Sequence, residues 1–499
     1  MLESIKEKAN IKSTENGART YESSGSHCLD LFATIGALRK ADDEEINSRF
    51  VRAYFENPDL AMKILFFARD IRGGLGERRV FRVALNWLAK NEPESVIKNL
   101  KYIAEFGRYD DLLSLMETPC EYEMIMFIKH QLEKDLDAAE NGDAVSLLAK
   151  WLPSVNTSNI DTKRFGKKLA KSLGLSEKEY RKALSLLRSR IQIIENNLRE
   201  KDYTFDYEKQ PSNALLKYKE AFLRYDNERY SAFIADVCAG KKKLNAANIA
   251  PYELVKQYIA NRSIWGIKDD SFLDILSSEQ KSVINATWDS IPDYCNGENA
   301  LAVIDTSGSM YSSLYQVPPA SVALSLGIYL AERNKGCFKN HFIMFSKRPQ
   351  LIELKGETFI DKLRYAVSFN EIANTNLESV FDLILGAALE HNAAQEELPA
   401  KLIIVSDMEF DSCVDNASAV NLENANAKFK AAGYKLPQVV FWNVASRNRQ
   451  QPVRQNEAGV ALVSGVTPRI FSMVAGDLIS PYELMMETLG NKRYNSIAA

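Results

Sequence analysis

The chain has 499 residues, of which 46% are hydrophobic and 26% are charged. This length predicts about two to four domains, and the composition excludes a mainly disordered, collagenous or membrane-embedded protein. The net charge of −3 argues against nucleic acid as a partner, but an average over the whole chain can hide a basic segment.

The sequence shows no export or membrane signal. Its first residues alternate charged and polar side chains, and no stretch reaches the roughly 18 uninterrupted apolar residues of a spanning helix. We therefore expect a cytoplasmic protein. The six cysteines have no CxxC spacing, which predicts neither a disulfide framework nor a zinc cluster.

Residues 1–290 are predicted to be helical, because apolar residues recur at spacings of three and four. The clearest stripes are Leu60, Ile64, Phe67 and Ile71; Val80, Ala84, Leu85 and Leu88; and Val96, Leu100 and Ile103. Turn-forming residues separate the stripes at Asn57-Pro58, Gly73-Gly74, Glu92-Pro93 and Gly107. Ser176 and Glu179 form a capping-box pattern ahead of a helix predicted to reach about Arg199. No fixed repeat period is visible, so the pattern predicts an irregular helical solenoid or bundle.

From Ala300 the pattern changes to short apolar runs that alternate with helical segments. The predicted strands are 300–304, 342–345, 402–405, 439–441 and 460–463, and the clearest helices are 321–333, 377–390 and 421–432. Continuous apolar strands separated by helices are typical of a parallel sheet covered on both faces. We therefore expect a doubly wound α/β domain over residues 299–499, after a boundary at 289–299.

Oxygen-bearing side chains follow two of these strands. Asp305, Ser307 and Ser309 alternate in the loop after the first strand, where ligands bind in doubly wound folds. Thr375 precedes a predicted helix and Asp407 ends another strand. Carboxylate and hydroxyl oxygens are ligands for hard cations such as Mg²⁺. The three loops together predict a metal site.

This pattern, DxSxS followed by a distant threonine and aspartate, resembles the metal-ion-dependent adhesion site (MIDAS) of von Willebrand factor type A domains. The resemblance implies that Asp305, Ser307, Ser309 and Thr375 coordinate a divalent cation directly and that Asp407 acts mainly through water. The cation would be Mg²⁺, or Mn²⁺ or Ca²⁺. The resemblance also implies an open position on the metal that an acidic residue of a partner protein fills.

Other interpretations of this loop are open. Asp, Ser and Gly are common in strand-to-helix turns, so the motif can be a turn without a ligand. A phosphatase of the haloacid dehalogenase type needs a second carboxylate two residues after the first, where this chain has Ser307. Glu409, Asp411 and Asp415 either support a ligand site or form a solvated acidic loop, and the pattern favours the solvated loop.

Residues 163–243 contain 20 Lys and Arg against 11 Asp and Glu, a local net charge of +9 that leaves −12 for the rest of the chain. The candidate RNA-binding cations are Lys163, Arg164, Lys167, Lys168, Lys171, Arg181, Lys182, Arg188 and Arg190, together with Arg78 and Arg79 beside the turn at 73–76. Aromatic residues, among them Tyr180, Tyr207, Phe222 and Tyr225, are interleaved with the cations of this segment. Cations neutralise phosphates and aromatic rings stack on bases, which favours RNA. A solvated helix face with aromatics in the core is the alternative.

Six segments, in order, resemble an uncharacterised family of bacterial, phage and plant proteins. They are ARDIRGGLGERRVF, IAEFGRYDDLL, LLAKWLPS, YRKALSLLRSRIQIIE, PSNALLKYKEAFLRYD and VSDMEFD. That family is similar in architecture to the TROVE module of the Ro autoantigen, in which α-helical HEAT-like repeats precede a von Willebrand factor A domain. The resemblance implies a helical repeat region over 1–290, a von Willebrand A domain over 299–499, and binding of small non-coding RNA.

Our leading hypothesis is a TROVE-like RNA-binding protein that acts without a membrane, as a monomeric ring or a small oligomer. In it the metal-bearing domain closes the array or recruits a partner. The alternative is a metal-dependent protein-interaction scaffold that binds an acidic residue of a partner, without RNA. An enzyme is not expected, because no nucleophile paired with a base is visible in the sequence.

Overall fold

The computed structural model describes residues 1–191, 193–254, 256, 273–311, 318–345, 348–369, 375–412 and 420–499. These residues group into two compact units. The helical unit comprises Leu65–Gln210 and Asn495–Ala499, and the mixed unit comprises Met1–Ile64 and Pro211–Tyr494. The first 64 residues thus belong with the α/β region, so the compact units do not follow the division expected at 289–299.

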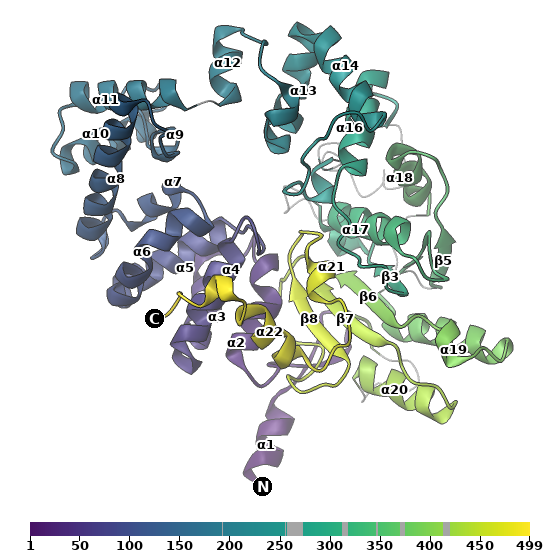
Figure 1. The fold of residues 1–499 in the computed structure, drawn as a ribbon. Helices are drawn as coiled ribbons and strands as arrows, with labels where there is room; N and C mark the ends of the chain where they lie inside the picture. Colours follow the sequence, from purple (N-terminus) through teal and green to yellow (C-terminus); the bar gives the residue numbers. More distant parts are fainter. Residues whose placement is uncertain are drawn as a thin grey trace. The chain divides into compact units, whose positions relative to one another are not determined.

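The helical unit begins with the three segments that the apolar stripes predict and continues with further helices (Figure 1). Its helices are α4 (Pro58–Arg69, which begins in the mixed unit), α5 (Arg79–Asn91), α6 (Pro93–Phe106), α7 (Tyr109–Leu112), α8 (Glu121–Asn141), α9 (Leu148–Trp151), α10 (Ile160–Ser172), α11 (Glu177–Arg190) and α12 (Ile194–Glu200), with short 3-10 turns η2 (Leu113–Leu115) and η3 (Tyr207–Lys209). The stripes of α5 and α6 are buried, as predicted. Ile71 is 37% exposed, because α4 ends at Arg69 and the chain has already turned.

A buried ion-pair network fixes the turn after α6. The Nε atoms of Arg69 and Arg82 donate to the two carboxylate oxygens of Asp111, at 2.7 and 2.6 Å. The backbone N–H of Arg108 donates to the same carboxylate at 2.9 Å. A Cβ atom at Gly107 would clash with the Asp111 carboxylate and the Arg69 guanidinium, so a larger residue would displace this ion pair.

The helix predicted from Ser176 to about Arg199 is two helices. Its start is confirmed: Ser176 Oγ accepts from the N–H of Glu179, and a Glu179 carboxylate oxygen accepts from the N–H of Ser176 at 2.9 Å. However, α11 ends at Arg190, because Ile191 and Ile193 have extended backbone. The Asn196 amide donates to the carbonyls of Arg188 and Ile191 and so satisfies the end of α11.

The mixed unit contains a six-stranded sheet in the order β5-β4-β3-β6-β7-β8. Its strands are β3 (Ala300–Ile304), β4 (His341–Met344), β5 (Gln350–Glu353), β6 (Lys401–Ser406), β7 (Gln438–Asn443) and β8 (Val460–Ser464). The five strands predicted from apolar runs are confirmed and are mutually parallel. We expected a purely parallel sheet. This prediction is wrong at one edge, where β5 pairs antiparallel with β4. Only Ile352 of β5 is buried, so this edge strand has no apolar run to reveal it.

Helices accompany the sheet throughout. In the mixed unit they are α1 (Leu2–Ala9), α2 (His27–Thr34), α3 (Asp43–Glu56), α13 (Ser212–Tyr225), α14 (Asn227–Cys238), α16 (Ser278–Asp289), α17 (Pro319–Arg333), α18 (Phe359–Val367), α19 (Leu377–Glu390), α20 (Asn421–Ala431), α21 (Ile470–Met473) and α22 (Pro481–Leu489), with 3-10 turns η1 (Ile35–Ala37), η4 (Pro251–Leu254), η7 (Gly308–Tyr311), η8 (Gln395–Glu397) and η9 (Lys492–Tyr494). Figure 1 shows α17 on one side of the strands and α20 on the other. Helix α17 is buried along most of its length against β3, β4 and β6.

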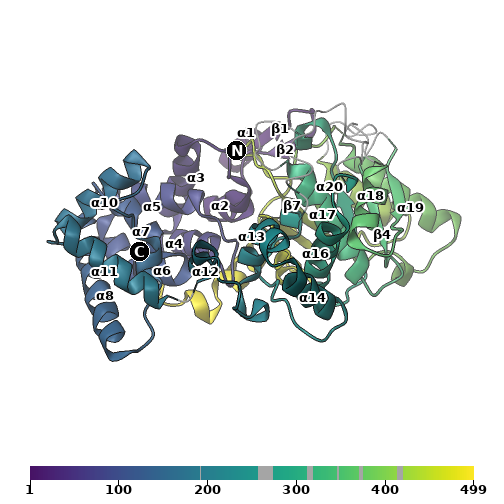
Figure 2. The same ribbon diagram turned by 90° about the horizontal axis from the view of Figure 1, so that it is seen from above.

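The N-terminal residues complete the sheet domain. Helix α2 packs on β8, where the N–H of Gly36 donates to Ser464 Oγ at 2.9 Å. The two-stranded hairpin of β1 (Ile11–Ser13) and β2 (Arg19–Tyr21) is near α20 in Figure 2, and an isolated bridge pairs Arg19 with Val420. Apolar surface on α2 and β8 is buried by this contact, which explains why the N-terminal segment joins the mixed unit.

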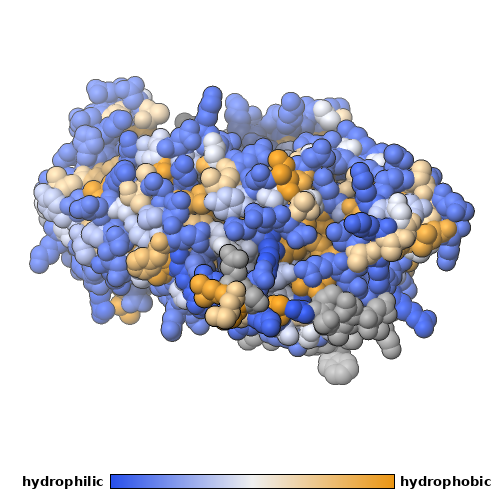
Figure 3. Space-filling model, turned by 90° about the horizontal axis from the view of Figure 1, so that it is seen from below, coloured by the Kyte–Doolittle hydropathy of each residue, from blue (hydrophilic) through white to orange (hydrophobic). Residues whose placement is uncertain are grey.

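On the face drawn in Figure 3, hydrophilic side chains predominate and hydrophobic ones are scattered in small groups. Within the described residues, none of the helices combines the length and the hydrophobicity that a membrane crossing requires.

Candidate functional site

The strand order places the predicted metal-binding loops at the switch point of the sheet. Counted within this sheet, the order of the strands is 3-2-1-4-5-6, the order of doubly wound folds, whose ligands bind where the strand order reverses. Here the reversal lies between the adjacent strands β3 and β6. Asp305 follows the last residue of β3, and Asp407 follows the last residue of β6. The two carboxylates therefore emerge side by side at the carboxyl end of the sheet.

Asp305 is fully buried and is held at both oxygens. Its Oδ1 accepts from the N–H of Ser307 at 2.8 Å, and its Oδ2 accepts from Ser406 Oγ at 2.6 Å. Burial raises the pKa of Asp305 well above its ordinary value, and the negative charge of Asp407 raises it further. Two carboxylates that repel one another in a buried loop are stabilised by a cation between them.

The hydroxyl groups of the motif are partly gathered at this place. Ser307 Oγ and Ser309 Oγ lie 3.1 Å apart, close enough to hydrogen bond. Thr375 is buried, and its carbonyl accepts from the N–H of Asp411 at 3.0 Å. This bond ties the Thr375 backbone to the loop that follows Asp407. The structure thus joins Asp305, Ser307 and Ser309 in one loop and anchors Thr375 to the neighbouring one.

Two residues that the sequence did not suggest contact this region. Arg447 Nη2 donates to Asp407 Oδ2 at 3.0 Å, and its Nη1 donates to Glu15 at 2.8 Å. Arg447 lies in the loop after β7, the next strand of the sheet. Its position after a predicted strand could have identified it from the sequence as a residue near the site. Glu15 lies in the N-terminal hairpin, nearly 400 residues away along the chain, and no sequence pattern connects it to Asp407.

The sequence favoured a solvated acidic loop after Asp407, and this prediction is wrong for Glu409. That side chain is only 2% exposed, and burial raises the pKa of its carboxyl group. Its oxygens accept from the N–H of Glu15 at 2.8 Å and from Asn448 Nδ2 at 2.9 Å. Glu409 therefore fastens the N-terminal hairpin to the loop. Asp411 is partly buried, and Asp415 lies outside the described residues.

The donor set fits a hard divalent cation. Two carboxylates and nearby hydroxyls match the oxygen ligands that Mg²⁺, Mn²⁺ and Ca²⁺ accept. Arg447 already supplies one positive charge to Asp407, which leaves Asp305 as the carboxylate without a cationic partner among the described contacts. No cluster of three or more His, Cys, Asp or Glu side chains suited to a metal occurs among the residues that the structure describes. Any cation here would depend on the hydroxyl ligands as well.

The predicted basic segment is divided between the two units. Residues 163–210, with 13 Lys and Arg against 7 Asp and Glu, belong to the helical unit, and the segment continues into the mixed unit from Pro211. Lys167 pairs with Glu177 at 2.9 Å, and Lys168 pairs with Glu117 at 2.6 Å. These two cations have acidic partners within the protein, at exposed positions where solvent screens the pairs.

Other predicted cations of the helical unit stay available. Exposed side chains that have no ion-pair partner within the described structure are Lys163, Arg164, Lys171, Arg181, Lys182 and Arg190. Arg188 is half-buried and lines a cavity with Arg181 and Lys182. Arg78 and Arg79 are exposed at the start of α5, and burial together with the positive charges of Arg108 and Arg82 lowers the pKa of Arg78.

Three of the interleaved aromatic residues do not face solvent. Tyr180, Tyr207 and Phe222 are 0 to 4% exposed, so they cannot stack on bases. Tyr225, at 61% exposure, is an exception, but it belongs to the mixed unit. The expected alternation of cations with stacking rings is therefore wrong for the three buried residues, whose rings pack in the core.

These features define a protein with a helical N-terminal region followed by a mixed sheet with a parallel core, whose switch point carries an oxygen-rich group of loops. Residues 14–126 and 122–295 match the family described as Domain of unknown function (DUF2828), and residues 299–483 match Domain of unknown function (DUF7788). The chain belongs to the DUF2828 family, whose match covers more than half of its length.

One relative and one solved structure are similar over nearly the whole chain. "Uncharacterized protein L728" of Acanthamoeba polyphaga mimivirus is 30% identical over 524 residues, covering 96% of this chain and 87% of that protein. The crystal structure of Deinococcus radiodurans RO (RSR) protein matches with a TM-score of 0.47 and 14% sequence identity, covering 94% of this chain and 100% of that chain.

Proposed function

We propose that this chain is a non-enzymatic, TROVE-like RNA-binding protein whose helical region binds small structured or single-stranded RNA. The observation that carries the proposal is the group of exposed, unpaired cations on α10 and α11: Lys163, Arg164, Lys171, Arg181, Lys182 and Arg190. Cations that the protein does not neutralise are free to displace counterions from a phosphate backbone. With few exposed aromatic rings nearby, binding rests on phosphates more than on base stacking.

In this proposal the mixed unit contains a von Willebrand A domain that binds a divalent cation. Its strand order and the position of Asp305 and Asp407 at the switch point support this assignment. Asp305, Ser307, Ser309, Thr375 and Asp407 would hold the ion. The cation would supply a positive charge for an acidic group, either of the same chain when the array closes or of a partner.

Charge reversal on α10 tests the RNA proposal. Lys163→Glu, Arg164→Glu and Lys171→Glu together should weaken binding of a single-stranded or hairpin RNA by about tenfold or more. Each lost phosphate contact should also reduce the slope of log affinity against log salt by about 0.7. Fluorescence anisotropy over a range of salt concentrations measures both quantities.

The matched control reverses three exposed lysines elsewhere in the same unit, Lys90, Lys129 and Lys134. It changes the net charge equally but leaves α10 and α11 intact, so its salt slope should stay close to that of the wild type. Equal loss in both variants would show non-specific attraction, and unchanged affinity in the α10 variant would reject this surface.

A metal-dependent protein-interaction scaffold is the second candidate, favoured by the mutual repulsion of Asp305 and Asp407 in a buried loop. In that case Thr375→Ala should release protein partners captured from the native host, and nuclease treatment should leave those partners bound. Thr157→Ala, at a partly exposed position of the helical unit, is the control. Loss of partners on nuclease treatment would favour RNA instead.

A further inference from the structure

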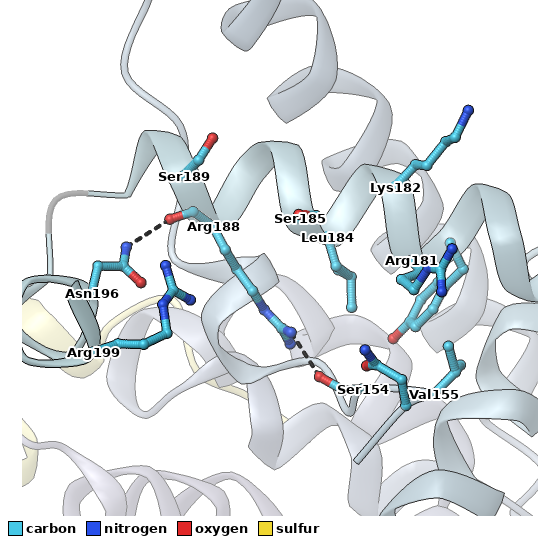
Figure 4. Close-up of a pocket in the computed structure, with 12 residues that line it drawn as sticks. Ser154, Val155, Arg181, Lys182, Leu184, Ser185, Arg188, Ser189, Asn196 and Arg199 are labelled. Atoms are coloured by element: carbon cyan, nitrogen blue, oxygen red, sulfur yellow. Dashed lines mark hydrogen bonds between the residues drawn. The ribbon is translucent and has the colours of Figure 1, made fainter.

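The helical unit contains a polar cavity of about 550 Å³, which is within the size range of small-molecule sites (Figure 4). It lies between the loop after α9, helix α11 and helix α12. Its charged lining includes Arg181, Lys182, Arg188 and Arg199, and serine hydroxyl groups come from Ser154, Ser185 and Ser189. None of the described residues that line it is acidic.

Arg188 is held rigidly at the centre of this cavity. Its Nε donates to the carbonyl of Ala149 at 2.8 Å, its Nη1 to Ser154 Oγ at 2.7 Å, and its Nη2 to the carbonyl of Leu152 at 2.7 Å. A guanidinium has five N–H donors, so two remain for a ligand. All three acceptors are neutral, and burial lowers the pKa of Arg188. The half-buried cation thus lacks a carboxylate to balance its charge.

Two further arginines surround Arg188. Figure 4 shows Arg199 reaching from α12 toward Arg188, and Arg181 at the other end of the cavity, while Lys182 extends away from them at the rim. Arg199 makes an exposed contact with Glu200 at 2.9 Å, which solvent screens. Three guanidinium groups with no acidic lining residue make the cavity a receptor for an anion of more than one charge.

We propose that this cavity binds a phosphate monoester, the dianionic group of a mononucleotide or of a phosphorylated RNA end. Guanidinium groups bind phosphate through paired hydrogen bonds, and the immobilised Arg188 loses little conformational freedom on binding. The cavity shares Arg181 and Lys182 with the proposed RNA-binding cations, but its assignment rests on Arg188 and Arg199, which are not among them.

Recognition in the cavity is directed at phosphate more than at a base. Tyr180 is the aromatic residue among the described lining side chains, and it is fully buried with its hydroxyl donating to the carbonyl of Pro153 at 3.0 Å. No lining ring therefore offers an open face for stacking. We expect inorganic phosphate and different nucleoside monophosphates to bind, whereas a nucleoside without phosphate does not.

Thermal shift and calorimetric titration of the full chain test this proposal with inorganic phosphate, adenosine monophosphate and adenosine. Phosphate and the monophosphate should stabilise the wild type, and adenosine should have no effect. Arg181→Gln with Arg199→Gln should weaken phosphate affinity by roughly tenfold or more per arginine. Both side chains are exposed, so the double variant should stay folded.

Lys129→Gln with Lys134→Gln removes the same charge at exposed positions of α8, outside the cavity and the RNA-binding cations, and should retain the wild-type phosphate affinity. No stabilisation by either phosphate compound, or equal affinity in both double variants, would overturn the proposal. Two further probes identify the source of the phosphate. Tighter binding of a 5′-phosphorylated oligonucleotide than of the monophosphate supports an RNA end, and the reverse order supports a small phosphorylated metabolite.

If phosphate binds the cavity while charge reversal on α10 leaves RNA affinity unchanged, the RNA-binding surface is rejected and the cavity stands. If RNA binds through α10 but adenosine monophosphate does not bind, the cavity is rejected and the RNA-binding surface stands.

Discussion

Asp111 is the carboxylate that balances the buried positive charge of Arg69 in the helical unit. It is fully buried and accepts from Arg69, which is 2% exposed, and from Arg82. A buried ion pair adds little net stability when complete, but loss of one partner leaves the other charge without compensation. The ARDIRGGLGER and GRYDD segments of the sequence therefore carry a structural network in addition to any role in binding.

Asp111→Asn should destabilise the helical unit by about 3 kcal/mol or more, because the charge of Arg69 stays buried without its partner. Denaturant unfolding followed by circular dichroism measures the change. Glu133→Gln, at an exposed position of α8, should change stability by less than about 0.5 kcal/mol. An Asp111→Asn variant as stable as this control would show that Arg69 is compensated elsewhere.

Asp305 offers a direct test of the metal site. Mg²⁺ should raise the melting temperature of the wild type, because a ligand that binds only the folded state stabilises it by mass action. Asp305→Asn keeps the size of the side chain and removes its charge, so the Mg²⁺ increment should disappear. Differential scanning fluorimetry with Mg²⁺ or chelator measures it.

The control for Asp305 is Asp382→Asn, which removes an exposed carboxylate of α19 that pairs with Lys428. It should keep the wild-type increment. If Mg²⁺ shifts Asp305→Asn as much as the wild type, the cation does not bind at the switch point.

Helix α11 shows how local signals define the start of an element better than its end. The Ser176 and Glu179 side chains satisfy backbone donors within the first turn, which is a purely local effect. The end at Arg190 is marked by the amide of Asn196, a nearby residue, and by the contacts of Arg188 with the loop after α9. The contacts of Arg188 are tertiary, and the continuous helical pattern through Arg199 concealed the break.

Ser176→Ala should destabilise the helical unit by about 1 kcal/mol, because the N–H of Glu179 loses its acceptor. Ser185→Ala, at an exposed position in the middle of the same helix, should be neutral or slightly stabilising, because alanine has the higher helix propensity. Chemical unfolding of the two variants side by side measures the difference. Equal stability would mean that water replaces the cap without cost.

At the scale of the whole molecule, residues that are distant in sequence build the mixed unit. Arg49 of α3 donates to Ser446 Oγ and to the carbonyl of Asn448, both at 2.9 Å, and Arg449 pairs with Glu45. Together with α2 on β8, these contacts bury the edge of the sheet under the N-terminal helices. An α/β domain that begins at residue 299 lacks this cover.

The isolated segment 299–499 should therefore be insoluble or bind a hydrophobic dye, because the face of β8 that α2 covers is exposed. Supplying residues 1–64 in trans to segment 211–499, which keeps the rest of the mixed unit, should restore a folded, soluble complex, whereas residues 65–128 should not. Solubility and near-ultraviolet circular dichroism measure the outcome. A soluble, well-folded segment 299–499 would show that the sheet domain is independent of the N-terminus.

The sequence by itself determined what depends on local chemistry. Apolar periodicity located the buried helices α5 and α6, and continuous apolar runs located the five parallel strands. The carboxylates that follow two of these strands placed Asp305 and Asp407 at the carboxyl end of the sheet. These predictions succeeded because periodicity and parallel-sheet topology constrain which side chains can share a face or an edge.

Only the tertiary structure decided which charges are available and which segments join. Lys167 and Lys168 are ion-paired, Arg188 lines a cavity, Glu409 is buried, and the N-terminal hairpin reaches the loop after β6 through Glu15. Each depends on contacts between different elements of the fold, and such contacts leave no periodic trace in the sequence. The net charge of −3 is therefore a poor guide to partners, since the sign and accessibility of each surface are fixed by packing.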